Sequence, residues 1–158
     1  MRLFSRSVSV AFMGGIVAAS LSVFCASAHA VLGQQISSIN SDNIRMKAQG
    51  NVFVRPSYSI HEMRIPNGTS VREFASPAGE VFAVSWKGPY VPDLRQLMGG
   101  YFDQYMAAMA NTRRTHGSVV RIETGDLVFE SGGHMRFIVG RAYLRSKLPD
   151  GVGPDAIQ

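Results

Sequence analysis

Cysteine is almost absent from this sequence, which has a single one, Cys25, among 158 residues. It lies at the end of an apolar N-terminal run, and removal of that run as a signal peptide would leave a cysteine-free mature chain. A disulfide framework, a thiolate nucleophile and a cysteine metal site are then excluded together. Three histidines remain after cleavage, His61, His116 and His134, and no two of them have the i, i+4 spacing of a helical zinc motif, so we expect neither metal nor cofactor.

The N-terminus has the three parts of a secretory signal in the right order. Two arginines precede an apolar run over Val8–Phe24, and Ala28-His29-Ala30 offers the small-x-small pattern of a cleavage site. The run is interrupted by glycines and serines and falls short of the roughly 20 apolar residues of a membrane span. We therefore expect residues 1–30 to be a cleaved signal peptide. Bulky Phe24 before Cys25 argues against lipoprotein processing.

The mature chain, from about Val31, is expected to be periplasmic or secreted, without a transmembrane anchor. Residues 31–158 have the size of a single domain. Two of the 16 basic residues lie in the leader, so 14 basic residues face 11 acidic ones, a net charge of +3. Export and the lack of a basic, aromatic-interleaved motif argue against nucleic acid as a partner. The positive charge favours an anionic envelope polymer or lipid head group, against the alternative of an ordinary solvated surface.

Three segments predict an antiparallel meander: Tyr58–Ile65, Thr69–Ala75 and Glu80–Trp86. The turns between them, Pro66-Asn67-Gly68 and Pro77-Ala78-Gly79, each combine a proline at the first turn position with a glycine able to take positive φ. Both are typical of three-residue loops that close on a bulge.

The turn type fixes the register of the first hairpin. A three-residue loop sets Glu62 opposite Arg72, whereas a two-residue Asn-Gly loop would set Glu62 opposite Glu73, an unfavourable like-charge pair. We choose the three-residue loop, which also pairs Met63 with Val71 and His61 with Glu73. In the second hairpin the same reasoning places Phe74 beside Phe82, on one core face with Ile60, Val84 and Trp86.

A long amphipathic helix follows, with apolar residues at steps of three and four over Leu94–Met109. Asp93 is its expected N-cap, with Gln96 as capping-box partner. Gly99 and Gly100 interrupt the pattern, and they indicate either a close backbone approach or a kink.

The rest of the chain predicts about three further strands, so the fold class is α+β, an antiparallel sheet covered by the long helix. The expected strands are Val119–Glu123, Asp126–Ser131 and His134–Leu144, with turns at Thr124-Gly125 and Gly132-Gly133. We also expect a short N-terminal helix over Gln34–Lys47, a connector over Gly50–Pro56 and an irregular tail from about Leu148.

Two sequence blocks carry a resemblance to a known family. The first begins at Ile60-His61-Glu62, continues through Val71-Arg72-Glu73-Phe74 and ends at Pro92-Asp93-Leu94. The second is Ser131-Gly132-Gly133-His134-Met135-Arg136, followed by Gly140-Arg141-Ala142-Tyr143-Leu144. With these motifs the chain resembles an exported bacterial family catalogued as domain of unknown function 2844. The resemblance implies an exported single domain and carries over no activity, substrate or site residue.

The candidate site residues are few. Glu62 and Arg72 form an expected ion pair on the Phe74 face, which indicates either a functional site or an edge open to water. His61 and His134 are the histidines that could join Glu62 in acid-base catalysis, although a strand-end role is the commoner one for each. Candidate anion-binding residues are the basic side chains Arg72, Arg113, Arg114, Arg136, Arg141, Arg145 and Lys147.

These patterns favour a non-enzymatic binding or accessory protein of the bacterial cell envelope. The alternative is a small envelope hydrolase that uses Glu62 with His61 or His134, with or without a metal. A surface module for anionic polymers is the third hypothesis. The Ser131-Gly132-Gly133-His134 stretch lacks the elbow motif of serine hydrolases, so we interpret its glycines as a hairpin turn.

Overall fold

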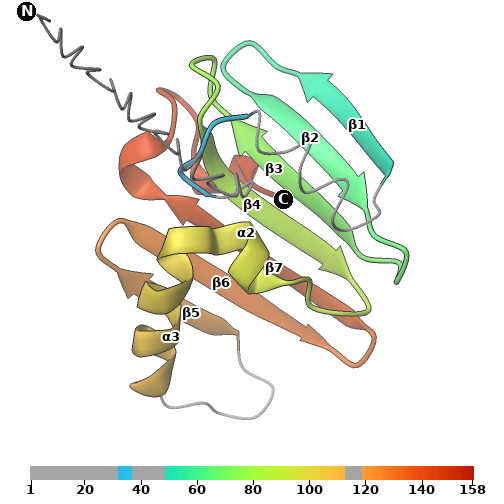
Figure 1. The fold of residues 1–158 in the computed structure, drawn as a ribbon, viewed down its shortest axis with the longest axis vertical. Coiled ribbons are helices and arrows are strands. Elements are labelled where there is room, and N and C mark those ends of the chain that lie inside the picture. The colour runs from blue at the N-terminus through green and yellow to red at the C-terminus, as the bar shows by residue number, and fades with distance from the viewer. Residues whose placement is uncertain (1–31, 37–48, 113–118) are drawn as a thin grey trace, which may run out of the picture.

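A computed structural model describes residues 32–36, 49–112 and 119–158 of the chain. Its centre is a seven-stranded antiparallel sheet with the strand order β1-β2-β3-β4-β7-β6-β5 (Figure 1). The last strand in sequence, β7, therefore lies in the middle of the sheet beside β4. The strands are β1 (Gln49–Val54), β2 (Ser59–Arg64), β3 (Ser70–Ala75), β4 (Val81–Gly88), β5 (Val120–Thr124), β6 (Leu127–His134) and β7 (Phe137–Leu144).

The first predicted hairpin is confirmed in its turn and its register. Gly68 has a φ of 89°, and the Ile65 amide donates to the Thr69 carbonyl over 2.9 Å, as a three-residue loop requires. Glu62 lies opposite Arg72 and Met63 opposite Val71. The second loop has the same form, with Gly79 at a φ of 80°.

The face predicted for β4 is wrong beyond the second turn. Ala75 pairs with Val81 as expected, but a β-bulge then places Phe74 opposite Ala83 instead of Phe82. One extra residue on a strand turns over the faces that follow it. Phe82 still packs with Phe74, whereas Val84 and Trp86 belong to the core on the opposite side of the sheet.

The long helix covers one face of the sheet and is broken in the middle. It consists of α2 (Leu94–Met98), a 3-10 turn (Gly99–Tyr101) and α3 (Phe102–Ala110). Asp93 caps it as predicted, accepting from the Gln96 amide over 3.0 Å. Gly99 has a φ of 46° and marks a kink in the helix. A methyl group on Gly100 would meet no atom within 4 Å, so Gly100 does not serve a close approach. No described helix is long and apolar enough to cross a membrane.

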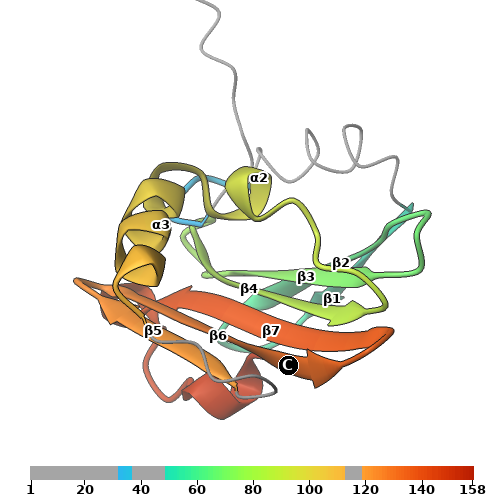
Figure 2. The ribbon, with the colours of Figure 1, turned by 90° about the horizontal axis from the view of Figure 1, so that it is seen from below.

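The sheet is covered on both faces. Helices α2 and α3 pack on one face, which we call the helix face. There the Phe129 ring packs at a tilt against Trp86 and Tyr105, with ring centroids 5.5 and 4.5 Å apart. The C-terminal residues after β7 fold under the opposite face, which we call the tail face (Figure 2). There Ile157, Leu148 and Val152 pack against a second cluster that includes Phe74, Phe82, Val128 and Tyr143. The predicted tail is thus part of the core and contains a 3-10 turn over Pro154–Ala156.

Two further predictions about elements need correction. The expected connector over Gly50–Pro56 is mostly edge strand β1, and Pro56 lies in its turn to β2. Gly132 and Gly133 lie within β6, and the turn is at Met135-Arg136, with Arg136 at a φ of 64°. A side chain at Gly133 would come within 2.2 Å of the Phe137 carbonyl oxygen, so this glycine serves close strand approach.

The predicted N-terminal helix over Gln34–Lys47 falls mainly on 37–48, outside the described residues. Its first residues are not helical, because Gln35 forms an isolated antiparallel bridge with Glu80. Leu32 and Gly33, which precede this bridge, are bonded to the helix on one side and to β4 on the other. Leu32 is 1% exposed and its amide donates to Leu97 over 3.1 Å, while Gly33 donates to Val81 over 2.7 Å.

Candidate functional site

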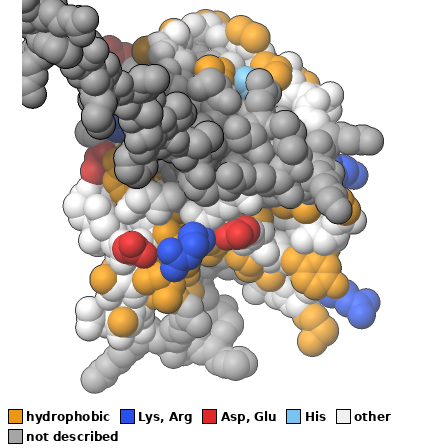
Figure 3. All heavy atoms as spheres, viewed as in Figure 1, with side chains coloured by type: hydrophobic (Ala, Val, Ile, Leu, Met, Phe, Trp, Pro, Cys, Tyr) orange, Lys and Arg blue, Asp and Glu red, His pale blue; other side chains and the backbone are white. Residues whose placement is uncertain are grey.

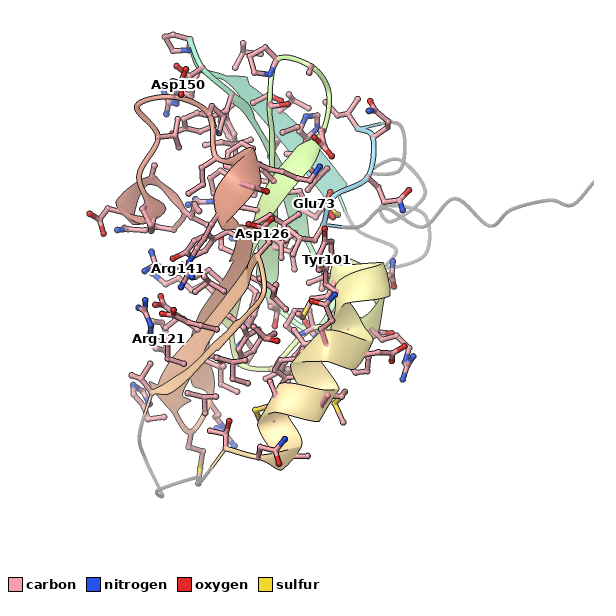
Figure 4. All side chains as sticks on the ribbon, turned by 90° about the vertical axis from the view of Figure 1, so that its left-hand side faces the viewer. Glu73, Tyr101, Arg121, Asp126, Arg141 and Asp150 are labelled. Atoms are coloured by element: carbon pink, nitrogen blue, oxygen red, sulfur yellow. The ribbon has the colours of Figure 1, made fainter. Side chains whose placement is uncertain are left out.

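A row of polar side chains crosses the tail face from one sheet edge to the other. The cross-strand register places the residues of this charged row next to one another on successive strands: Asn51, Glu62, Arg72, Ser85, Arg141, Glu130 and Arg121. Figure 4 shows Arg141 and Arg121 on the side of the sheet away from helix α3, with Glu73 and Tyr101 towards the helix. The row therefore divides the tail face into two parts.

Ion pairs and backbone contacts hold the charged row in place. Arg72 contacts Glu62 at 2.7 Å, and Arg141 contacts Glu130 at 2.6 Å. The same two arginines fix the C-terminal segment, since Arg72 donates to the Gln158 main-chain oxygen and Arg141 to the Pro154 carbonyl, over 2.7 and 2.6 Å. These arginines act as supports for the tail. The apolar cluster under Ile157 lies on one side of the row.

No described segment covers the other side of the row, and we call it the open end. Its side chains come from the next register row, which includes Arg64, Ser70, Lys87 and Val139, together with Phe137. Two adjoining hollows of about 440 and 510 Å³ lie here, and both are lined by Ser85, Trp86, Lys87 and Gln158. Together they form a shallow groove across the centre of the sheet.

Glycine keeps the groove open on its apolar side. Gly132 faces Val139 across the strands, and a methyl group there would come within 3.0 Å of Val119. Val119 is 70% exposed, Phe137 40% and Val139 38%. An apolar strip thus lies beside the polar half of the groove.

The cations of the open end have no acidic partner in the part of the chain that the structure describes. Neither Arg64 nor Lys87 makes an ion pair with any described residue, and both side chains are exposed. Lys87 lies over the Phe137 ring, with its Nζ 5.4 Å from the ring centroid. On the helix side, by contrast, Figure 3 shows the most prominent basic group between two acidic groups. The open end therefore offers positive charge next to exposed apolar surface.

The structure does not bring the predicted acid-base residues together. His61 and Glu62 are neighbours on β2, so their side chains point to opposite faces. Burial lowers the pKa of His61, whose ring bonds to the Ser59 hydroxyl at 3.2 Å. His134 is on the tail face, but three strands lie between β2 and β6, so four strand spacings of about 4.8 Å, or about 19 Å, separate the two strands that carry Glu62 and His134. Among the described residues no cluster of three metal-ligating side chains exists.

Most of the predicted anion-binding cations within the described residues are paired. Arg145 contacts Glu123 and Lys147 contacts Glu80. Hydrogen bonds from Arg121 and Arg145 lower the pKa of Glu123, and the hydrogen bond to Glu80 raises the pKa of Lys147. Arg136 is exposed at the tip of the β6–β7 hairpin. Arg113 and Arg114 lie outside the described residues.

Sequence reasoning missed Arg64, Ser70 and Lys87 as possible binding residues. Each lies two positions from a member of the charged row on the same strand, so the alternation of β2, β3 and β4 places all three on its face. For Lys87 the missing signal was the bulge in β4, which decides whether its side chain faces the helix or the tail. Arg64 and Ser70 could have been found, because the predicted register of the first hairpin already places them on the face of Glu62 and Arg72.

Fold and surface together define a small α+β domain with a groove on its sheet. The chain belongs to the family described as a protein of unknown function, DUF2844, whose model matches residues 28–157. This confirms the resemblance seen in the sequence. No curated protein and no solved structure matches the chain.

Proposed function

We propose that the protein is a non-enzymatic binding module of the bacterial cell envelope, and that its open end binds the anionic surface of a lipid membrane. The observation that carries the proposal is the juxtaposition of two unpaired cations, Arg64 and Lys87, with the exposed apolar side chains of Phe137 and Val139. Basic residues attract acidic head groups, and apolar side chains at the same level can enter the head-group boundary.

The tip of the β6–β7 hairpin extends the same surface. Met135 is 89% exposed and adjoins Arg136, and Phe137 follows directly in the chain. His134 stacks on Phe137 with ring centroids 5.5 Å apart, which holds the aromatic ring at the end of the hairpin. A hairpin end with Met, Phe and Arg side chains suits shallow insertion between acidic head groups. The proposed export would place this surface within reach of an envelope membrane.

Cosedimentation with lipid vesicles tests this function. The purified protein should bind phosphatidylglycerol vesicles, bind phosphatidylcholine vesicles weakly, and be released as salt rises because exposed charges are screened. Each basic residue near an anionic surface contributes about 1 kcal/mol, so the double variant Arg64→Gln/Lys87→Gln should bind about thirtyfold more weakly.

Arg55→Gln is the matched control. Arg55 is also exposed, but it follows β1 at the opposite end of the β1–β2 ladder from Arg64. Its replacement removes one positive charge, as each single variant Arg64→Gln or Lys87→Gln does, and should leave binding unchanged. Equal binding to neutral vesicles, or an equal loss in the control, would contradict the proposal. Retention on dextran sulfate without vesicle binding would indicate an anionic polymer instead.

A further inference from the structure

The two edges of the sheet are protected to different degrees. Edge strand β5 carries Arg121 and Glu123, which pair with each other and with neighbouring charges. The opposite edge, β1, has the sequence Gln-Gly-Asn-Val-Phe-Val, with no charge and no proline. Natural proteins use charges, prolines and bulges on edge strands to prevent pairing with other chains. β1 has none of these within its six residues.

β1 also exposes a dense group of apolar side chains. Val54 is 81% exposed, Val52 59% and Phe53 46%. No described strand lies along the outer edge of β1, which is the end of the strand order (Figure 1). An edge that is both apolar and free to hydrogen-bond is a template for strand addition.

The hydrogen bonds of the β1–β2 hairpin show which backbone groups point outward. The Arg55 amide donates to the Tyr58 carbonyl over 2.8 Å, so Arg55 points inward to β2. Inward and outward residues alternate in an antiparallel pair. The outward amide and carbonyl groups therefore belong to Gly50, Val52 and Val54.

We infer that β1 pairs antiparallel with β1 of a second copy of the chain, about a twofold axis at Val52. In this register Val52 meets its own equivalent, and the outward groups of Gly50 meet those of Val54 in the partner copy. All three outward residues then bond, and the two sheets become one continuous sheet. The interface is isologous, so it closes at two copies and leaves no free β1 edge.

The side chains of β1 suit pairing with β1 of a second copy. Val54 lies opposite a glycine, which leaves room for the branched side chain, and Phe53 lies opposite Asn51. No charge faces a like charge between Gly50 and Val54, because this part of β1 carries none. The same strand thus supplies both halves of a compatible pair, which an unrelated peptide would have to match by its own sequence.

Sedimentation equilibrium over a range of concentrations tests the inference. The purified wild-type protein should form dimers. Val52→Lys places two like charges at the axis and should weaken self-association at least about tenfold, the equivalent of about 1.4 kcal/mol. Val52→Pro should act likewise, since it removes an outward amide and leaves the β1–β2 hydrogen bonds intact. Val119→Lys, at another exposed valine, is the matched control and should dimerise normally.

Disulfide trapping gives a readout that does not depend on a destabilised variant. In a Cys25→Ser background, Val52→Cys should form a covalent dimer on mild oxidation, because paired residues have Cα atoms about 5.5 Å apart. Val119→Cys should not. The inference would be overturned if the wild-type protein is monomeric, if Val52→Lys dimerises as well as the wild type, or if the two cysteine variants crosslink equally. A monomeric wild-type protein would also be the result if β1 instead captures an unrelated extended peptide.

Discussion

At the scale of single residues, Gly140 shows how one missing methyl group shapes the core. The Trp86 indole lies directly on this glycine, and a Cβ there would come within 2.2 Å of Cζ2 and 2.4 Å of Cε2. Trp86 is 2% exposed and its other neighbours include Phe129, so the ring has little room to move. The close approach therefore depends on glycine.

We expect Gly140→Ala to lower the free energy of unfolding by about 1–3 kcal/mol, the usual cost of overpacking a core. Gly153→Ala is the control, because Gly153 has a φ of −87° and a methyl group there would meet no atom within 4 Å. That variant should be neutral or slightly more stable. Urea unfolding of both variants measures the difference, and equal stability would show that Trp86 can shift at no cost.

His61 predicts a pH dependence of stability. Burial lowers its pKa below the ordinary value of 6.5, so between the two pKa values the unfolded chain holds more protons than the folded one. This contribution is fully present above the unfolded pKa and is lost as the pH falls from there towards the folded pKa. Urea unfolding of the wild type and His61→Gln at several pH values should show a steeper acid loss in the wild type. If the wild type is instead more stable than His61→Gln, and the difference in free energy of unfolding grows as the pH falls, then Glu73, opposite His61, favours the imidazolium.

At the scale of elements, the sequence allows prediction of what local chemistry determines. The two Pro-x-Gly loops specify their own turn type, and Asp93 specifies the start of the helix, so these were predicted correctly. The bulge at Phe82-Ala83 was not predictable, because it depends on how β3 and β4 pack between two different cores. β1 was missed because an exposed edge strand lacks the alternation that burial imposes.

The C-terminal tail is the element whose contribution sequence reasoning most underestimated. Ile157 is 1% exposed beneath Phe74 and Phe82, so Ile157→Ala should cost about 2–5 kcal/mol of stability. Val139→Ala, on the same face but 38% exposed, should cost much less. Chemical denaturation compares the two variants. Equal, small losses would show that the tail contributes little to the core.

At the scale of the whole molecule, the candidate groove could be predicted only in part. The Glu62–Arg72 pair followed from the first hairpin, and it proved to be half exposed, with side-chain exposures of 22% and 44%. The groove itself depends on long-range pairing of β4 with β7 and on the course of the tail. Neither has a local signature in the sequence, so the open end could not be predicted without the structure.

Processing of the N-terminus is the prediction for the chain as a whole. Cleavage after Ala30 would retain Leu32, which is buried and bonded to Leu97, whereas a cut a few residues later would remove this anchor. Mass spectrometry of the protein from its native host should therefore find a mature N-terminus at or near Val31. An intact Met1 start, or an acylated Cys25, would contradict it.

The central place of β7 has a consequence for the order in which the chain can fold. β4 is buried along Val81–Trp86, yet its second neighbour is formed by Phe137–Leu144, which leaves the ribosome or a translocation pore many residues later. Until then, this strand, which is buried over its first six residues, has one open side. Such non-local pairing slows folding and exposes the intermediate to aggregation. A chain synthesised from its N-terminus therefore completes its sheet in a single late step, and a chaperone that shields β4 would raise its yield.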